Sequence, residues 1–327
     1  MEYRPFGRTG MEVSAIGFGC WELGGSYGHI EEGEVIGAIH RAMDLGINCF
    51  DTAQAYGFGK SETLLAKGLG ERRKEVILVT KFGVNYKDSD RTKGRDSRRD
   101  RAMASIEASL DFLNTDYVDV YLIHWPDRET PFEETMRAVE DIVQQGKARF
   151  VGVSNFRAEE IAACMEIRRV DVGQYGYNMF DRRQEREAFP YCLEQGIGMM
   201  GYGPLAHGLL TGAFDETTTF GEGDWRRGGR AFNLPLFDEE NLPRNVKVAA
   251  DLKKLAQDRG KELYHLALAW VLSNPVMSVA LVGARTPEEV EANMGALELS
   301  LTEADQAEID AVFEAHGVNP HPDAWVE

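Results

Sequence analysis

The chain has 327 residues, 43% of them hydrophobic, and its 54 acidic residues outnumber its 36 basic ones to give a formal charge of −18. A surface this acidic repels nucleic acid and anionic membranes, so we expect neither as a partner. The length suits one large α/β barrel or two ordinary domains. No apolar stretch is long enough to span a membrane, and the early charges at Glu2, Arg4 and Arg8 give no sign of a secretory signal.

The opening residues predict a β-hairpin, because Tyr3–Phe6 and Glu12–Ser14 flank a turn that contains Gly10. After it, eight short apolar runs alternate with segments of helical period such as 35–43 and 106–113. Strands that alternate with helices predict right-handed βαβ units, and eight parallel strands close a barrel. The sequence thus predicts an α/β fold, a (β/α)8 TIM barrel with an N-terminal β-hairpin. Its predicted strands are Ile16–Cys20, Ile47–Phe50, Val76–Thr80, Val118–Ile123, Phe150–Val153, Val170–Val172, Ile197–Gly201 and Val279–Val282.

Several helix starts are marked by residues that typically cap a first turn. They lie at Ser61, Thr130, Thr286 and Thr302. A long loop after the seventh strand, residues 207–243, interrupts the alternation of strands and helices. It is rich in Gly, Thr, Asp and Arg and has no clear period. Such a segment is usually a lid, a binding loop or disordered. Since no linker interrupts the rest, a single domain over 1–327 is the simplest organisation.

The four cysteines have neither the spacing of metal ligands nor the density of a disulfide scaffold. Cys20 and Cys49 lie in apolar segments typical of strands. We therefore expect packed free thiols, no metal site and a reducing, cytoplasmic location. The remaining two cysteines are Cys164 and Cys192.

Four polar residues follow the apolar runs in a way that predicts one shared pocket. Asp51, Lys81 and His124 come directly after three successive strands, and Tyr56 lies five positions beyond Asp51. In a barrel of parallel strands, the residues at the carboxyl ends of the strands converge on the same rim. The spacing therefore brings together side chains from distant parts of the chain.

These four side chains suit the reduction of a carbonyl group. The carbonyl oxygen gains negative charge as hydride arrives, and it then needs a proton. A phenol such as Tyr56 can supply that proton, but an unperturbed tyrosine has a pKa near ~10. A nearby ammonium at Lys81 stabilises the phenolate, and Asp51 would keep that ammonium charged. His124 can orient the carbonyl through a hydrogen bond.

Five motifs, in this order, closely resemble those of the aldo-keto reductase family. The most characteristic is Asn48–Gly57, which is followed by Ser61-Glu62. The resemblance extends from the first hairpin to about Leu299. Its long insertion looks most like the bacterial and plant branch that includes the potassium-channel β subunits. The other motifs are Val79–Lys81, Leu122–Pro126, Gly152–Phe156 and Gly201–Leu205.

The resemblance implies an oxidoreductase that transfers hydride between NAD(P)H and an aldehyde or ketone, or from an alcohol or sugar in reverse. Tyr56 would be the general acid and base, partnered by Asp51, Lys81 and His124. The family's substrate contacts fall on Trp21, Tyr56, His124 and Trp125. Its cofactor contacts fall on Gly19, Cys20, Trp21, Ser154, Asn155, Gln174, Tyr202, Gly203, Pro204, Leu205, Gly208, Leu209, Gly283, Arg285, Glu289 and Asn293.

The two charged residues that the resemblance puts at the adenosine end of the cofactor oppose each other. Arg285 suits the 2′-phosphate of NADP(H). A carboxylate at Glu289 repels that phosphate unless it points away or pairs with Arg285. NADP(H) is therefore the favoured cofactor, and NAD(H) or use of both is the alternative.

The physiological substrate depends on loops without a motif of single chemical meaning, at 26–30, 84–95, 125–128 and 207–243. A sugar or polyol and a small aldehyde suit them equally, and Trp225 suits a pocket wall and simple packing equally. The channel β subunits imply an alternative function, a cofactor-binding redox sensor or regulatory subunit with little turnover. The sequence does not indicate an oligomeric state.

Overall fold

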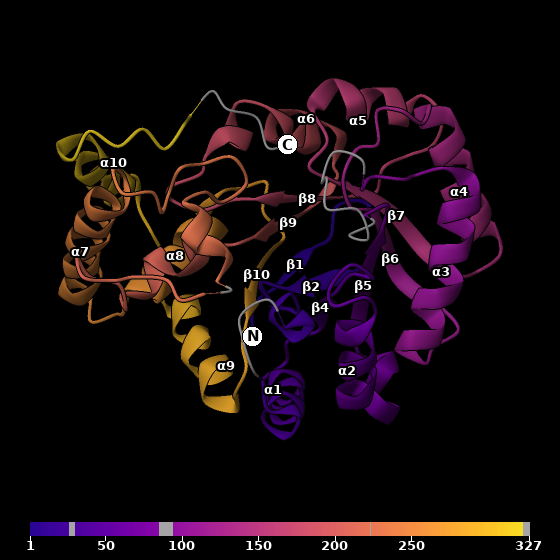
Figure 1. Ribbon diagram of the computed structural model, residues 1–327, viewed down its shortest axis with the longest axis horizontal. Helices are drawn as coiled ribbons and strands as arrows, with labels where there is room; N and C mark the ends of the chain where they lie inside the picture. The colour runs from indigo at the N-terminus through magenta and orange to yellow at the C-terminus, as the bar shows by residue number, and fades with distance from the viewer. Residues whose placement is uncertain (26–29, 85–93, 223, 323–327) are drawn as a thin grey trace.

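The centre of the protein is a closed barrel of parallel strands (Figure 1). The computed structural model describes residues 1–25, 30–84, 94–222 and 224–322. The strands follow one another around the barrel in chain order, and the last pairs with the first. They are β3 (Ile16–Gly19), β4 (Cys49–Asp51), β5 (Ile77–Phe82), β6 (Val118–Ile123), β7 (Ala148–Ser154), β8 (Val172–Gly176), β9 (Gly198–Tyr202) and β10 (Val279–Gly283).

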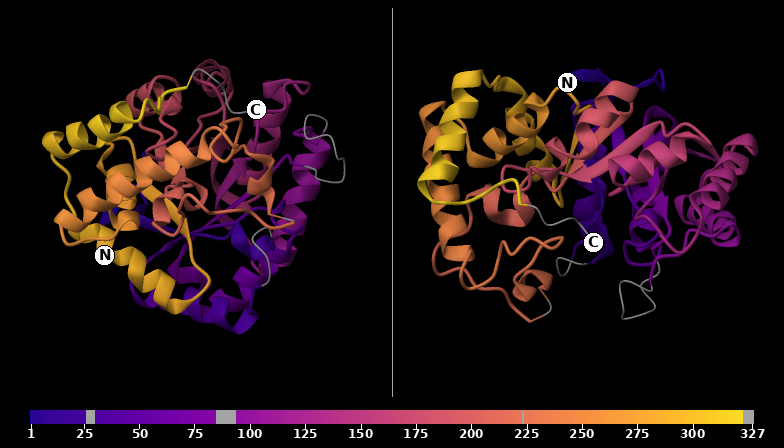
Figure 2. Two further views of the ribbon diagram at one scale, coloured as in Figure 1. Left: turned by 60° about the vertical axis from the view of Figure 1, so that its left-hand side comes forward. Right: turned by 90° about the horizontal axis from the view of Figure 1, so that it is seen from above.

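Helices surround this barrel, as the three views of Figures 1 and 2 show. α1 packs between α2 and α9, and the last helix, α10, packs on α7. They are α1 (Glu32–Asp44), α2 (Lys60–Leu69), α3 (Arg99–Leu113), α4 (Phe132–Gln144), α5 (Ala158–Met165), α6 (Ala188–Gln195), α7 (Leu242–Asp258), α8 (Leu263–Ser273), α9 (Pro287–Met294) and α10 (Glu303–Ala315). Short 3₁₀ turns are η1 (Glu22–Gly24), η2 (Gly70–Glu75), η3 (Arg183–Glu185), η4 (Ala206–Thr211), η5 (Trp225–Gly228) and η6 (Gly295–Glu298).

The predicted (β/α)8 barrel is confirmed, and its strands lie close to the predicted runs. The largest difference is at β8, which begins at Val172 and extends to Gly176 instead of covering 170–172. This strand continues through Gln174, whose side chain pairs with Asp51. Because the polar Gln174 interrupts the apolar run, the sequence pattern did not predict the second half of this strand.

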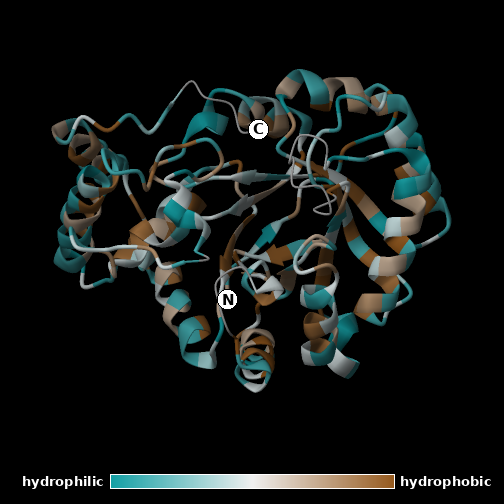
Figure 3. Cartoon of the chain, in the orientation of Figure 1, coloured by the Kyte–Doolittle hydropathy of each residue, from teal (hydrophilic) through white to brown (hydrophobic). Residues whose placement is uncertain are grey.

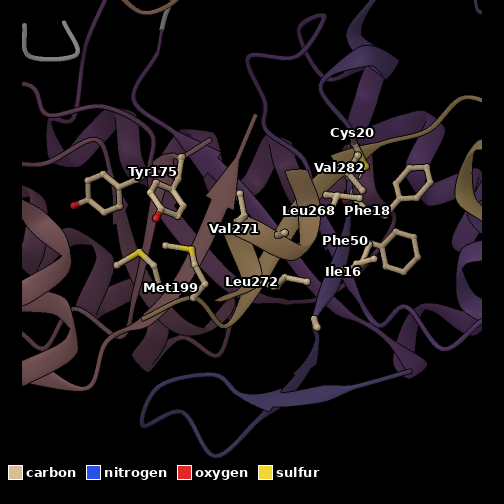
Figure 4. Packing of buried hydrophobic residues seen from close by; sticks show 14 of the residues in the cluster. Ile16, Phe18, Cys20, Phe50, Tyr175, Met199, Leu268, Val271, Leu272 and Val282 are labelled. Atoms are coloured by element: carbon tan, nitrogen blue, oxygen red, sulfur yellow. Dashed lines mark hydrogen bonds between the residues drawn. The ribbon is translucent and has the colours of Figure 1, made fainter. Parts of the chain in front are cut away.

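The main apolar core lies between the strands and the helices. On α1, Val35, Ala38 and Ile39 are buried, and the helix is polar on its other side, which matches the 3.6-residue period (Figure 3). Figure 4 shows part of this core, in which the rings of Phe18 and Phe50 stack with centroids 5.4 Å apart. The helices are thus held to the barrel by burial of apolar surface from both layers.

The N-terminal hairpin, β1 (Tyr3–Pro5) and β2 (Glu12–Ser14), contributes to a second core inside the barrel. Phe6 and Val13 are fully buried in the same cluster as inward residues of the barrel strands. The predicted hairpin is confirmed. Its role is to cover apolar side chains at the amino ends of the strands, opposite the rim where the polar residues gather.

The predicted helix caps have different outcomes. Thr286 and Thr302 cap α9 and α10 with their side chains, as predicted. Ser61 as a cap was wrong, because α2 begins at Lys60, and the Ser61 hydroxyl donates to the carbonyl of Cys20 instead.

The four cysteines are free and buried, as expected. Across the described part of the chain, no helix is long and apolar enough to cross a membrane.

Residues 207–243 form folded structure on the rim of the barrel, with only Gly223 outside the described residues. The segment contains most of η4 and all of η5, and Leu210 and Phe237 are buried. Ala231 and Leu234 form a two-residue hairpin, with mutual backbone hydrogen bonds of 2.8 Å. The parts of the other predicted specificity loops at 26–29 and 85–93 lie outside the described residues.

We predict that Phe6→Ala will lower the free energy of unfolding by about 3 kcal/mol or more, because it opens a cavity in the core inside the barrel. Leu193→Ala is the control, since Leu193 is 54% exposed and its truncation should change stability by less than about 1 kcal/mol. Urea denaturation followed by circular dichroism measures both. Equal effects of the two substitutions would contradict the proposed role of the hairpin.

Candidate active site

The structure brings Asp51, Tyr56, Lys81 and His124 together at the carboxyl ends of neighbouring strands. Asp51 ends β4, Lys81 lies near the end of β5, and His124 directly follows β6. Tyr56 lies in the loop between β4 and α2. The spacing argument therefore predicted the cluster correctly, since adjacent parallel strands carry three of its four members.

Lys81 is the centre of this cluster and is fully buried. Its ammonium donates to Asp51 Oδ2 at 2.7 Å, to the carbonyl of Thr52 at 2.8 Å and to Tyr56 Oη at 3.2 Å. An ammonium has three donors, so all three are used. The contact with Tyr56 is the longest of the three, and the two shorter contacts hold the charge in place.

Burial dominates the titration of the ion pair. It lowers the pKa of Lys81, against the attraction and hydrogen bond of Asp51. It also raises the pKa of Asp51, against the charge of Lys81 and the hydrogen bonds from Lys81 and Gln174. Each partner thus stabilises the charge that burial disfavours on the other.

The loop that carries Tyr56 is held by its backbone. Gly57, Phe58 and Gly59 have consecutive positive φ angles of 66°, 54° and 87°, which turn the chain sharply into α2. Such a φ angle is strained for Phe58. Gly24 packs so closely on this loop that a Cβ atom there would lie 2.8 Å from the carbonyl carbon of Tyr56. The phenol is therefore positioned by a tight turn with a close neighbour.

His124 contributes a buried imidazole beside the phenol. The ring centroids of His124 and Tyr56 are 5.7 Å apart at an interplanar angle of 79°. Burial, with a further contribution from the charge of Lys81, lowers the pKa of His124 well below its usual 6.5. The imidazole is thus neutral near pH 7. It can act as a hydrogen-bond donor or acceptor without bringing another positive charge to the site.

A chain of hydrogen bonds links this cluster to four further residues that the sequence assigns to the site. Gln174 Nε2 donates to Asp51 Oδ1 at 2.7 Å, and Ser154 donates to the carbonyl of Gln174 at 2.9 Å. Asn155 Nδ2 donates to Ser154 Oγ at 3.0 Å, and Tyr202 Oη donates to Asn155 Oδ1 at 3.0 Å. Residues on β4, β7, β8 and β9 therefore form one continuous polar layer across the rim.

Aromatic rings cover one side of the rim. The Trp21 ring lies 5.7 Å from that of Trp225 and 6.2 Å from that of Phe232. Phe232 also lies 6.1 Å from Trp125 and 5.4 Å from Tyr202. The structure thus places Trp225 in this aromatic cluster, together with the two tryptophans that the sequence assigned to the substrate.

Sequence reasoning missed Phe232, which is at the tip of the two-residue hairpin in the long loop. Its φ of 46° and the φ of 68° at Asn233 are both left-handed. The guanidinium of Arg183, itself bound to Asp181, donates to the Phe232 carbonyl at 3.3 Å. The asparagine was the available signal, because Asn tolerates the left-handed turn that such hairpins require.

The proposed cofactor residues of β9 and its following loop form an irregular backbone. Tyr202 ends β9, and Gly203, with Pro204 and Leu205, leads into η4. Gly203 and Gly208 have φ angles of 64° and 110°. Leu209 is fully buried in the apolar core. Turns of this kind can direct backbone N–H groups toward an anion.

At the other side of the rim, β3 and β10 run side by side and end in glycine. Gly19 pairs with Gly283, and Cys20 donates its N–H to the carbonyl of Asp51 at 2.8 Å. Trp21 follows and carries the chain into η1. At Gly283, the space that a side chain would fill is taken by the carboxyl group of Glu22.

The charged residues after β10 form a compact group. Arg285 Nη2 donates to Glu289 Oε1 at 3.1 Å, and the backbone N–H of Arg285 donates to Glu289 Oε2 at 2.7 Å. Sequence reasoning missed Glu22, whose carboxyl group lies against Gly283. Burial and the charge of Glu289, opposed by Arg285, raise the pKa of Glu22 to about 7. Asn293 is buried on α9.

We predict that Lys81→Met will lower the free energy of unfolding by about 3 kcal/mol, because it leaves the carboxylate of Asp51 buried without a counter-charge. Asp51→Asn combined with Lys81→Met should lose less than Lys81→Met alone, since no unpaired charge remains. Urea denaturation of the variants measures this coupling. A double variant less stable than Lys81→Met would contradict the account of the pair.

The chain is similar to known proteins over nearly its whole length. The chain matches the aldo/keto reductase family over residues 15–314. It is 38% identical to aldo-keto reductase YhdN of Bacillus subtilis, over 96% of this chain and 94% of that protein. It is 31% identical to an NADH-specific methylglyoxal reductase of Escherichia coli, over 96% and 99% of the two chains.

A solved structure, the glycerol dehydrogenase AKR11B4 from Gluconobacter oxydans, superposes with a TM-score of 0.87 at 32% identity, covering 99% of both chains. The similarity therefore includes the barrel, the hairpin and the loops around the rim. The chain belongs to the aldo/keto reductase family of oxidoreductases, which act on carbonyl compounds, alcohols and sugars.

Proposed function

We propose that this protein is an NADP(H)-dependent reductase of small aldehydes and ketones, with Tyr56 as the group that exchanges a proton with the substrate oxygen. The observation that carries the proposal is the position of the buried Lys81 ammonium, 2.7 Å from Asp51 and 3.2 Å from the Tyr56 oxygen. An ammonium in that position supports a phenolate, and it therefore eases release of the phenolic proton.

The roles of the four residues follow from their contacts. Tyr56 donates its proton to the substrate oxygen, and Lys81 stabilises the phenolate that remains. Asp51 keeps Lys81 charged and directs it. The neutral His124 donates a hydrogen bond to the same substrate oxygen and so orients the carbonyl. In the reverse direction, the Tyr56 phenolate accepts the proton of an alcohol.

The chain's own residues suit a nicotinamide cofactor, which supplies or accepts the hydride when bound. Ser154 and Asn155 offer polar groups for a carboxamide, and Tyr202 offers a ring face beside them. The turn at Gly203–Gly208 suits a pyrophosphate because its backbone adopts left-handed φ angles. Arg285 is the cation at the adenosine end, and its side chain is half exposed.

NADP(H) remains the cofactor that we propose. The sequence favoured it on the condition that Glu289 points away from the phosphate or pairs with Arg285. Glu289 pairs with Arg285 instead of standing alone in the path of a phosphate. A half-exposed pair of this kind contributes little stability, about 1 kcal/mol at most, and an arginine has further N–H donors for a phosphate. The similarity to an NADH-specific relative makes NAD(H) the competing cofactor.

The substrate that we propose is a short aldehyde or ketone. The aromatic cluster of Trp21, Trp125 and Phe232 presents apolar ring faces that suit a small substrate. Methylglyoxal and glycerol, in the names of two similar proteins, are both small and polar. We also propose a single domain over 1–327 and a reducing, cytoplasmic location, which the four buried free thiols support.

We predict that Tyr56→Phe will lower kcat for methylglyoxal reduction by about 10²-fold or more, because the proton donor is lost. NADPH affinity should change less than about twofold, since the ring is kept. Stopped-flow assays and cofactor fluorescence titration measure the two quantities. The control is Tyr3→Phe, which removes an exposed hydroxyl far from the rim. Near-normal turnover in Tyr56→Phe would exclude this tyrosine as the proton donor.

We predict that Glu289→Gln will raise the affinity for NADPH severalfold and leave that for NADH unchanged. The reason is that a single negative charge about 4 Å from a phosphate costs about 1 kcal/mol when water fully screens the pair, as it does at an exposed site. Glu291→Gln is the matched control, because Glu291 lies on the same helix and pairs with Arg41 instead. An equal change for both cofactors would argue against a 2′-phosphate site at Arg285.

A further inference from the structure

The first turn of α2 carries a carboxyl group that the mechanism does not use. Glu62 is fully buried, and its Oε1 accepts a hydrogen bond of 2.7 Å from the hydroxyl of Thr80. The Oε2 atom of Glu62 is buried near the hydroxyl oxygen of Ser109. Neither of these two oxygens makes a hydrogen bond of acceptable geometry with any described residue. Glu62 therefore has a single firm partner, on β5.

A carboxyl group in this position is unfavourable for stability alone. Burial raises the pKa of Glu62, against the hydrogen bond from Thr80, the nearby Ser109 hydroxyl and the charge of Lys81. A buried polar group with incomplete hydrogen bonding destabilises the folded state by about 1–3 kcal/mol in mutational studies. An apolar side chain of the same volume would avoid this penalty. The geometry of the Glu62–Thr80 contact offers a reason for its presence.

Thr80 directly precedes Lys81 on β5, and neighbouring residues of a strand point to opposite faces. Lys81 points to the cluster on the rim, so the hydroxyl of Thr80 points outward to α2. The hydrogen bond from Thr80 to Glu62 thus holds the outer face of β5 at the residue next to Lys81. Glu62 therefore affects the position of the Lys81 ammonium without contacting it.

The same turn of α2 also holds the Tyr56 loop. The Ser61 hydroxyl lies 2.9 Å from that of Thr52 and donates to the carbonyl of Cys20 at 2.8 Å. The backbone N–H of Ser61 donates to the carbonyl of Tyr56 at 3.1 Å. Residues 61 and 62 therefore connect α2 to the chain just after β3 and β4, to β5 and to the loop that carries the phenol.

We propose that Glu62 is a positioning residue for the Lys81–Tyr56 pair. Through Thr80 it keeps β5 in register with α2, and this holds the Lys81 ammonium within hydrogen-bond distance of the phenol. The Lys81–Tyr56 contact of 3.2 Å is near the upper limit for a hydrogen bond, so a shift of a few tenths of an ångström weakens it. The inference rests on the proposed function of Tyr56.

Four variants test the proposal in matched pairs. Glu62→Leu and Thr80→Val remove the acceptor and the donor of the contact, whereas Glu62→Gln and Thr80→Ser keep them. The first pair should lower kcat about tenfold or more, because small misplacements of reacting groups are costly. It should also move the pH of half-maximal alcohol oxidation upward, since the phenolate loses its ammonium. Cofactor affinity should be unchanged in all four.

Glu62→Gln and Thr80→Ser keep the hydrogen bond, so both should retain the wild-type pH profile. A merely structural role of Glu62 would not link the pH profile to this hydrogen bond. The proposal is overturned if Glu62→Leu and Thr80→Val melt earlier but keep the wild-type profile. It is also overturned if Glu62→Gln shifts the profile as far as Glu62→Leu, because charge and not the hydrogen bond would then matter. Failure of the proposed function is distinct, since wild-type protein or Tyr56→Phe would then already behave unexpectedly, and the inference would fall with it.

Discussion

The buried ion pair of Lys81 and Asp51 is the interaction on which the site depends. A lysine without exposed surface is stable in a barrel only if acceptors surround its ammonium, and here a carboxylate, a backbone carbonyl and a phenol do so. Since β4 and β5 are neighbours in the barrel, both charges are fixed by backbone pairing. The pair places a positive charge beside the phenol oxygen without requiring any movement.

Residues that stabilise the barrel and residues of the candidate active site lie at opposite ends of its strands. At the amino ends of the strands, the hairpin covers an apolar core that includes Phe6. At the carboxyl ends, polar side chains from four strands join into one hydrogen-bonded layer, and the loop after β9 adds aromatic rings above it. Most of the rim residues therefore rest on a rigid wall, whereas the features that select a substrate lie on loops.

Much of the fold could be predicted because buried parallel strands are short and apolar, and because they alternate with helices of clear period. The same regularity placed Asp51, Lys81 and His124 on one rim. The prediction failed where a residue's role depends on distant partners. Ser61 is an ordinary cap by sequence, yet its hydroxyl binds the carbonyl of Cys20. Gln174 extends β8 although it interrupts the apolar pattern.

Residues outside the strands were harder to assign, for physical reasons. Phe232 reaches the site through a left-handed turn in a loop without period, and only the adjacent Asn233 indicates that turn. Glu22 carries no distinctive pattern, and it is placed by the approach of η1 to Gly283. The roles of both depend on tertiary contacts that sequence periodicity does not report.

The most direct test of the central claim is the steady-state oxidation of NADPH by the purified protein in the presence of methylglyoxal, with NADPH alone as the reference. The account predicts turnover well above the reference, because the Lys81–Tyr56 pair is already positioned to transfer a proton. Tight binding of NADPH without turnover on methylglyoxal or other short aldehydes would contradict it, and would instead favour a protein that senses the cofactor.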